Sequence, residues 1–277
     1  MSLLMRAYLF VFAAFLYLPI AVLAIFSFNA SELMSFPLSG FTLDWYASLS
    51  ANRTLLTGLL TSFLIAQPVA ILTTALGLMA GLALTGKRLL WRGAFIAALL
   101  VPFIVPKGVL AIAQIMLMSR FGIPRGPGPL ILSEALVILP FTTLILTAVL
   151  VRLDRRLEEA ARDLGATPLT AFRYVILPQL KAALIAAYSV GVILSLADLT
   201  LSMFLAGRTQ PLSVIVSSAF RTSLSPDLNA MQVSVLAITI LVVIAVEIAR
   251  RRAGGRPVRF AERDATAEGE DIAARTG

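Results

Sequence analysis

The chain contains neither cysteine nor histidine. The absence of cysteine excludes disulfide bonds and thiol chemistry. Without both residue types the usual ligands of transition metals are missing, so we expect no metal site. Charged residues are also scarce, at 14% of the chain, whereas 59% of its 277 residues are hydrophobic. Soluble domains carry about a quarter charged residues. The composition therefore indicates an integral membrane protein.

Apolar runs recur along the chain, each close to the roughly 20 residues that a helix needs to cross a bilayer. We predict six membrane helices, at residues 6–28, 55–85, 92–118, 130–151, 180–204 and 229–249. The expected fold class is all-α and integral to the membrane, with one transmembrane domain over residues 1–252. The end of the chain, residues 253–277, is rich in glycine, alanine and charge. That composition is typical of a disordered tail.

Four prolines fall inside the predicted spans, namely Pro68, Pro102, Pro106 and Pro140. Proline has no N–H group and clashes with the preceding turn, so each should kink its helix. A kink in lipid leaves a carbonyl group that needs a partner, which favours a position facing protein or a water-filled path. Two interpretations stay open. The kinks are either hinges of a pore or fixed features of packing.

The basic residues are distributed unevenly between the two sides of the membrane. With six spans both termini lie on one side, and most of the 23 Lys and Arg residues fall there. The positive-inside rule makes that side the cytoplasm. The net charge of +8 is therefore mainly a topology signal. Basic and aromatic residues do not interleave outside the spans, so we expect membrane lipid and not nucleic acid as a partner.

The cytoplasmic segment at residues 153–180 is charged and polar although long apolar runs flank it. Its first part places leucine and alanine on one helical face. The opposite face carries two possible ion pairs at i,i+4 spacing, Arg155–Glu159 and Glu158–Arg162. This pattern predicts a short amphipathic helix.

A turn and a second short helix should follow. Gly165 suits the position just past a helix end, where glycine is favoured. Thr167 suits an N-cap, and Pro168 suits the first helical position after it. The whole segment is therefore predicted to form a helix–turn–helix on the cytoplasmic side.

This segment resembles the EAA loop of bacterial ATP-binding-cassette (ABC) importer permeases. The family pattern is Glu-Ala-Ala, three residues, Gly, nine residues, then Ile-x-Leu-Pro. The spacing matches throughout, with Val175 in place of the usual Ile. The residues that would couple to the ATPase are Glu158, Glu159, Ala160, Ala161, Gly165 and Pro178. In the family this loop is the coupling helix, so the resemblance implies that Glu159 contacts an ATPase subunit and that Gly165 sets the turn.

The resemblance also implies the type I ABC importer permease fold, with six transmembrane helices and both termini cytoplasmic, in the bacterial cytoplasmic (inner) membrane. The chain would not be an enzyme and would bind no cofactor itself. ATP and Mg would bind to a dimer of partner ATPase subunits. A second permease subunit, expected to be a homologous different chain, would complete the pore. A periplasmic or extracellular solute-binding protein would deliver the solute.

Ionisable side chains within a membrane cost roughly 2.5–3.5 kcal/mol each, so they are candidates for function. Asp198 in the fifth predicted span is the main candidate for the substrate pathway, because a carboxylate attracts cations. Lys107 lies in the third span. Either it pairs with Asp198 and holds the two spans together, or the path carries both signs and suits a zwitterion. Glu134 lies near the external end of the fourth span, from which its side chain could also reach water.

The stretch around Asp198 resembles the polyamine-type (spermidine/putrescine) subfamily of these permeases. The resemblance rests on an acidic residue after Ser-Leu, on Gly207, on the proline–leucine pair at 211–212 and on Pro-x-x-Asn-Ala from Pro226. Two departures reduce it, because Ala197 replaces a usual acidic residue and the pair is Pro-Leu instead of Leu-Pro. The resemblance implies a polyamine or a similar small organic cation as substrate. Iron, thiamine and aminophosphonates are the alternatives within the subfamily.

Two other classes of protein are weaker candidates. A stand-alone secondary carrier or channel needs no ATPase-binding loop, and the chain shows no internal repeat of the kind common in such carriers. A membrane-embedded enzyme is disfavoured because histidine, cysteine and paired carboxylates in helical register are missing. Only the importer subunit predicts an ATPase that co-purifies with the chain.

Overall fold

The computed structural model describes residues 3–31, 38–86, 91–222 and 226–253. Helices make up nearly all of this part of the chain. In order they are α1 (Leu3–Phe26), α2 (Asp44–Ala51), α3 (Arg53–Thr85), α4 (Arg92–Ile104), α5 (Lys107–Arg120), α6 (Pro127–Leu150), α7 (Arg155–Asp163), α8 (Pro168–Ala171), the π-helix η1 (Phe172–Ile176), α9 (Leu177–Leu196), α10 (Thr200–Leu205), α11 (Leu212–Thr222) and α12 (Pro226–Ala253). The tail predicted at 253–277 lies, after Ala253, outside the described residues.

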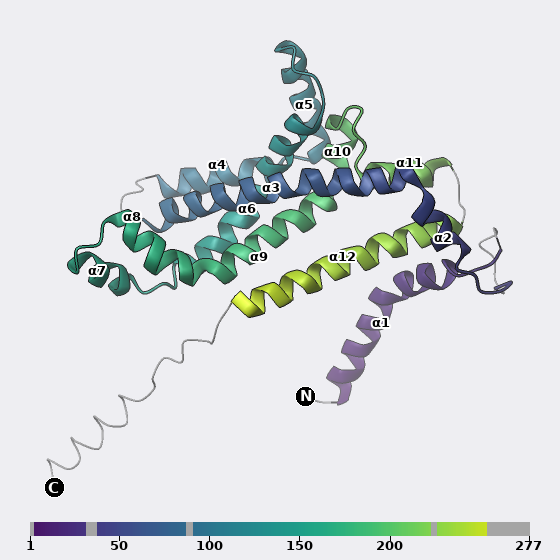
Figure 1. The fold of residues 1–277 in the computed structure, drawn as a ribbon, viewed down its shortest axis with the longest axis horizontal. Helices are drawn as coiled ribbons and strands as arrows, with labels where there is room; N and C mark the ends of the chain where they lie inside the picture. The colour runs from purple at the N-terminus through teal and green to yellow at the C-terminus, as the bar shows by residue number, and fades with distance from the viewer. Residues whose placement is uncertain (1–2, 32–37, 87–90, 223–225, 254–277) are drawn as a thin grey trace, which may run out of the picture.

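The centre of the bundle is formed by α3, α6 and α9, which pack against one another. Helix α4 contacts α6, and α12 contacts α9 (Figure 1). Helices α7 and α8 lie at one end of this bundle, whereas α2 and α11 lie at the other end. Helix α5 points away from the bundle beside α10, and α1 diverges from it while contacting α12. The all-α class predicted from the sequence is confirmed.

Small residues allow the central helices to approach closely. A methyl group built on Gly191 of α9 would lie 2.9 Å from the Cα atom of Ala70 in α3, and one on Gly77 would lie 2.8 Å from Oγ1 of Thr142. The Thr142 hydroxyl also donates a hydrogen bond to the carbonyl oxygen of Thr73 at 2.8 Å. Close backbone contact and hydrogen bonds between helices are the main sources of helix association in lipid.

Replacing Gly191 by alanine should therefore lower the thermal stability of the protein. The added methyl group meets backbone, which cannot move away as a flexible side chain would, and such overpacking typically costs about 1–3 kcal/mol. That cost exceeds the gain of about 1 kcal/mol from replacing glycine in a helix. The measurement is the melting temperature of the detergent-solubilised protein. Gly93→Ala is the control, because a methyl group there meets nothing within 4 Å; equal melting temperatures for the two variants would contradict the packing argument.

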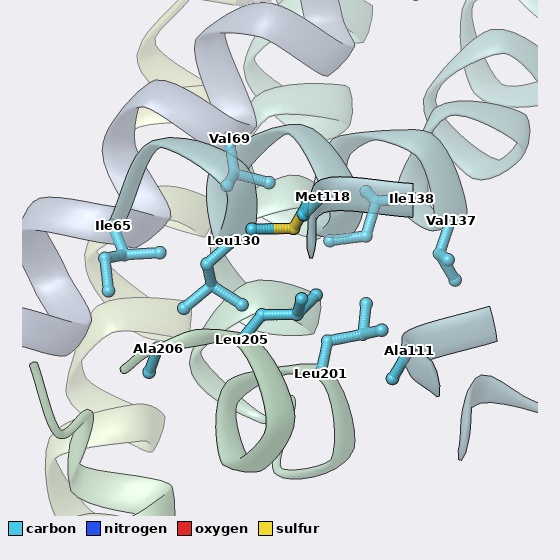
Figure 2. Close-up of a cluster of buried hydrophobic side chains, with 10 residues drawn as sticks. All are labelled: Ile65, Val69, Ala111, Met118, Leu130, Val137, Ile138, Leu201, Leu205 and Ala206. Carbon is cyan, nitrogen blue, oxygen red and sulfur yellow. The ribbon is translucent and has the colours of Figure 1, made fainter. Parts of the chain in front are cut away.

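A hydrophobic cluster joins the peripheral helices α5 and α10 to the central bundle (Figure 2). It contains side chains of α3, α5, α6 and α10, together with the residue after α10. Its members are Ile65, Val69, Ala111, Met118, Leu130, Val137, Ile138, Leu201, Leu205 and Ala206. Leu130, Leu201 and Leu205 are completely buried. We call this group the α5–α10 cluster, and it positions the two helices that border the polar site described below.

The predicted span at residues 92–118 is not one continuous helix. Helix α4 ends at Ile104, α5 begins at Lys107, and the two are bent by 96°. Val105 between them is extended, with φ −69° and ψ 131°. The cause is Pro106, since a proline disfavours the helical conformation at the residue before it and supplies no N–H group. By contrast Pro68, Pro102 and Pro140 lie inside continuous helices.

The predicted fifth span also differs from the structure. Helix α9 begins at Leu177 and ends at Leu196, and α10 begins only at Thr200, so residues 180–204 are not one helix. Within the described ranges four helices are long and apolar enough to cross a membrane, or five if α4 and α5 count as one bent span. The predicted span at residues 229–249 falls in α12. The total of six spans stays a prediction.

Candidate functional site

Asp198 lies in the break between α9 and α10 and not, as predicted, inside a membrane helix. The residue is 4% exposed. Its Oδ1 atom accepts a hydrogen bond of 2.8 Å from the backbone N–H of Leu201, in the first turn of α10. Its backbone carbonyl oxygen accepts a further hydrogen bond of 3.0 Å from Oγ of Ser213. The broken helix thus buries a carboxylate and gives it a fixed orientation.

Lys107 forms an ion pair with Asp198 through its Nζ atom and Oδ2 of the carboxylate. Lys107 is the first residue of α5, directly after the break at Pro106. The pair therefore connects two helix breaks that are far apart in the sequence. Of the two arrangements left open by the sequence, the paired one is observed. The two side chains differ in burial, because that of Lys107 is 45% exposed and that of Asp198 only 3%.

Glu134 is buried, and the expectation that its side chain could reach water is wrong. The residue lies within α6 and is 1% exposed. Its carboxyl group accepts hydrogen bonds from two serine hydroxyls, that of Ser195 in α9 and that of Ser202 in α10, the latter at 3.3 Å. Burial of a carboxyl group in an apolar bundle is tolerated because these hydroxyls replace part of its hydration. Tertiary packing, which brings α9 and α10 over α6, decides this position.

Together these residues form one polar cluster at the meeting point of α5, α6, α9 and α10. We define the polar cluster as Lys107, Glu134, Ser195, Asp198 and Ser202. Sequence reasoning missed the roles of the two serines. Ser195, Asp198 and Ser202 follow one another at spacings of three and four residues, which is the helical spacing that could have pointed to a shared face. The carboxylate of Asp198, which pairs with the ammonium group of Lys107, is the group of this cluster that can bind a cation.

A second candidate site is the helical loop at the end of the bundle, where α7 forms as predicted. Asp154 caps the helix by accepting a hydrogen bond from the backbone N–H of Arg156 at 2.9 Å. Arg162 pairs with Glu158 at 2.6 Å, as the i,i+4 spacing predicted. The side chain of Arg155 lies outside the described residues.

The turn after α7 confirms the position of Gly165. Its φ is +89°, a value that side-chain-bearing residues rarely adopt. The N–H of Gly165 donates to the carbonyl of Arg162, and the N–H of Ala166 donates to that of Ala161, at 2.9 and 3.0 Å. These two bonds define a Schellman motif, which satisfies the last carbonyl groups of a helix. The fixed spacing between Ala161 and the glycine follows from this motif.

The second helix of the loop is not separate, contrary to the prediction. Thr167 caps α8 and Pro168 is its first residue, as expected. However, α8 continues through the π-helix η1 directly into α9. Pro178, the second residue of α9, accounts for the wider turn, because it cannot donate the hydrogen bond that an α-helix requires at that point.

The surface of this loop combines exposed apolar side chains with a cavity that both charged and apolar residues line. Leu164, Leu169 and Tyr174 are 90%, 74% and 70% exposed. Glu158 and Glu159 line a cavity of about 630 Å³ between α7 and the ends of α3 and α6. Exposed apolar residues of this size next to charged groups are typical of a surface for protein partners.

A bundle of long apolar helices with a buried polar cluster at its helix breaks, and a polar helical loop at one end, is the architecture of a multi-pass membrane protein. Comparison with protein families gives the same result. Residues 74–254 match the model of the binding-protein-dependent transport system inner membrane component, and the chain belongs to this family. It is a permease component of an ABC importer in the bacterial inner membrane, and the ATPase is a separate subunit.

Individual relatives agree with this family. The chain is 30% identical to the spermidine/putrescine transport system permease protein PotC of Haemophilus influenzae, over 89% of this chain and 96% of the relative. It is also 30% identical to the putrescine transport system permease protein PotI of Escherichia coli, over 80% of this chain and 82% of the relative. Among solved structures, a bacterial ABC transporter that imports alginate matches with a TM-score of 0.70 at 17% identity. That match covers 88% of this chain and 94% of the other.

Proposed function

We propose that this chain forms half of the translocation pore of an ATP-driven importer for a polyamine or a similar small organic cation. The observation that carries the proposal is the buried carboxylate of Asp198 at the break between α9 and α10. A broken helix exposes backbone groups that an unbroken one would pair, and such breaks occur in membrane proteins where they line a cavity. A carboxylate at this point attracts a cation and repels anions.

The substrate class also has support from the relatives. PotC and PotI are named for the transport of spermidine and putrescine, which are small organic amines. Their ammonium groups suit the carboxylate of Asp198. Iron, thiamine and aminophosphonates are the alternatives, and the last of these carry an anionic group that the carboxylate of Asp198 disfavours.

The helical loop is proposed to be the coupling element. Glu158, Glu159, Ala160, Ala161, Gly165 and Pro178 would form the surface that binds an ATPase subunit in the cytoplasm. The exposed side chains of Leu164 and Leu169 would pack against that subunit. The loop and both chain termini would then lie on the cytoplasmic side, as the distribution of basic residues indicates.

The assembly would contain this chain, a second permease that is a homologous different chain, and partner proteins on both sides of the membrane. Two ATPase subunits would bind ATP and Mg, and this chain would bind no cofactor. A solute-binding protein would deliver the substrate from outside. ATP binding would draw the two coupling loops together and switch the pore between outward-facing and inward-facing states.

Uptake of labelled putrescine tests the proposed function. Cells that lack their own polyamine uptake would express this chain with its partner ATPase, permease and binding protein. We expect saturable uptake that disappears when the ATPase subunit is omitted. Uptake that persists without the ATPase would indicate a stand-alone carrier. An assembled complex that takes up neither putrescine nor spermidine would contradict the polyamine assignment and leave the other small solutes to be tested.

A further inference from the structure

The Lys107–Asp198 ion pair has one fixed member and one movable member. We propose that the ammonium group of Lys107 is an internal ligand that occupies the place of a substrate ammonium group on Asp198 and is displaced by the substrate during transport. This inference rests on the proposed function, because it takes an ammonium group as the part of the substrate that is recognised.

Asp198 is the fixed member. Its side chain is 3% exposed. Oδ1 is held by the backbone N–H of Leu201 at 2.8 Å, and the backbone carbonyl is held by the hydroxyl of Ser213 at 3.0 Å. Both bonds are independent of Lys107. The carboxylate therefore keeps its place and direction when the partner of Oδ2 is exchanged.

Lys107 is the movable member. Its side chain is 45% exposed, so the ammonium group reaches the buried carboxylate from an open side. A lysine carries its charge on a flexible stem of four carbons, which allows Nζ to turn away without movement of the backbone. The next residue, Gly108, has nothing within 4 Å of the position where a side chain would begin, so the start of α5 is not tightly enclosed.

The exchange replaces one ammonium group on Asp198 by another. A primary ammonium group of putrescine is the same functional group as the end of a lysine side chain, so one ion pair replaces another and no covalent bond changes. The released Lys107 is hydrated on its exposed side. In the absence of substrate, Lys107 prevents Asp198 from being a buried and unpaired charge, which is strongly destabilising. An acidic site can therefore stay folded while it is empty.

A purely structural ion pair is the competing interpretation, in which the pair serves to hold α5 against α10. The α5–α10 cluster already does this without charge. Ala111 and Met118 of α5 and Leu201 and Leu205 of α10 are buried in one hydrophobic group (Figure 2). A salt bridge with one half-exposed partner adds little to such packing. The ion pair is therefore available for a role in recognition.

Equilibrium binding of labelled putrescine tests the exchange directly. The permease–ATPase complex would be reconstituted in lipid nanodiscs without the binding protein, so that only the site in the pore is measured. If Lys107 occupies Asp198 about nine-tenths of the time, Lys107→Met should lower the dissociation constant about tenfold. Lys107→Arg keeps a tethered cation and should stay close to wild type. A structural pair predicts no gain in affinity for Lys107→Met.

The absence of cysteine from the chain permits a second test in the same complex. Lys107→Cys should bind putrescine tightly, like Lys107→Met. Reaction of the new thiol with an aminoethyl methanethiosulfonate attaches an ammonium group through a disulfide bond and should weaken putrescine binding again. Reaction with a methyl methanethiosulfonate attaches a neutral group through the same kind of bond and should leave binding tight. Identical binding after both treatments would overturn the inference. The treated wild-type complex controls for thiols of the partner subunits.

Failure of the inference and failure of the proposed function give different results. If wild type takes up and binds putrescine but Lys107→Met binds it no more tightly, only the internal ligand is excluded. If wild type neither takes up nor binds putrescine or spermidine, the polyamine assignment is excluded, and the inference with it.

Discussion

Gly165→Pro is expected to reduce ATP-dependent uptake to background. Gly165 has a φ of +89°, whereas the proline ring holds φ near −65°. Proline also removes the N–H group that donates to the carbonyl of Arg162 at 2.9 Å. The Schellman turn is lost on both counts, so α7 can no longer keep its orientation relative to α8. A misplaced α7 could not serve as the proposed coupling element between the ATPase and the pore. The measurements are uptake of labelled substrate and co-purification of the ATPase subunit.

Gly165→Asn is the matched control, because asparagine adopts positive φ at small cost and retains the N–H group. It should support uptake close to that of wild type. Glu159→Lys leaves the turn intact and reverses the charge on the proposed docking surface. It should therefore release the ATPase by changing the charge of this surface, whereas Gly165→Pro acts by displacing α7. Normal uptake in Gly165→Pro would exclude the coupling role of this loop. Normal yield of the variant from the membrane shows that insertion is unaffected.

Asp198→Asn is expected to lower the uptake of putrescine at low concentration by about 10- to 100-fold. A hydrogen bond to a charged group contributes about 1.5–3 kcal/mol, which corresponds to this range. The asparagine oxygen can still accept the hydrogen bond from the N–H of Leu201, so α10 keeps its first turn. The substitution removes the charge and little else. Uptake should be measured at several putrescine concentrations together with the melting temperature of the complex.

The melting temperature separates recognition from folding in this experiment. Lys107 loses its partner in Asp198→Asn, but its side chain is 45% exposed and can be hydrated. The melting temperature should therefore change little while uptake falls. An unchanged rate of uptake, or a loss of uptake in proportion to a loss of stability, would reassign Asp198 to packing.

Local features of the proposed coupling loop were predictable from the sequence. The cap at Thr167, the pair Glu158–Arg162 and the positive φ at Gly165 all involve residues within one or two turns of each other. Such features depend on short-range geometry, which the order of residues determines directly. The π-helix η1 was not predicted, although Pro178 supplies a local cause for it.

The helix breaks depend on tertiary packing more than on the local sequence. Of the four prolines in the predicted spans, Pro106 separates two helices, whereas Pro68, Pro102 and Pro140 lie inside continuous helices. The break at residues 197–199 contains neither glycine nor proline, so the local sequence does not indicate it. Packing of α5 and α10 against α3 and α6 stabilises these breaks, and that packing is a property of the folded chain.

The sequence by itself determined the class of this protein: hydropathy selects the membrane, and the spacing of the coupling loop selects the family. Hydropathy is a sum over the residues of a segment, and the spacing of the loop is a local pattern, so neither depends on the tertiary fold. Only the tertiary structure decided the composition of the polar cluster. Lys107 and Asp198 are 91 residues apart, and Glu134 lies 61 residues before Ser195. Residues so far apart in the sequence meet only when the helices that carry them pack together. That packing determines which buried charged groups have a partner.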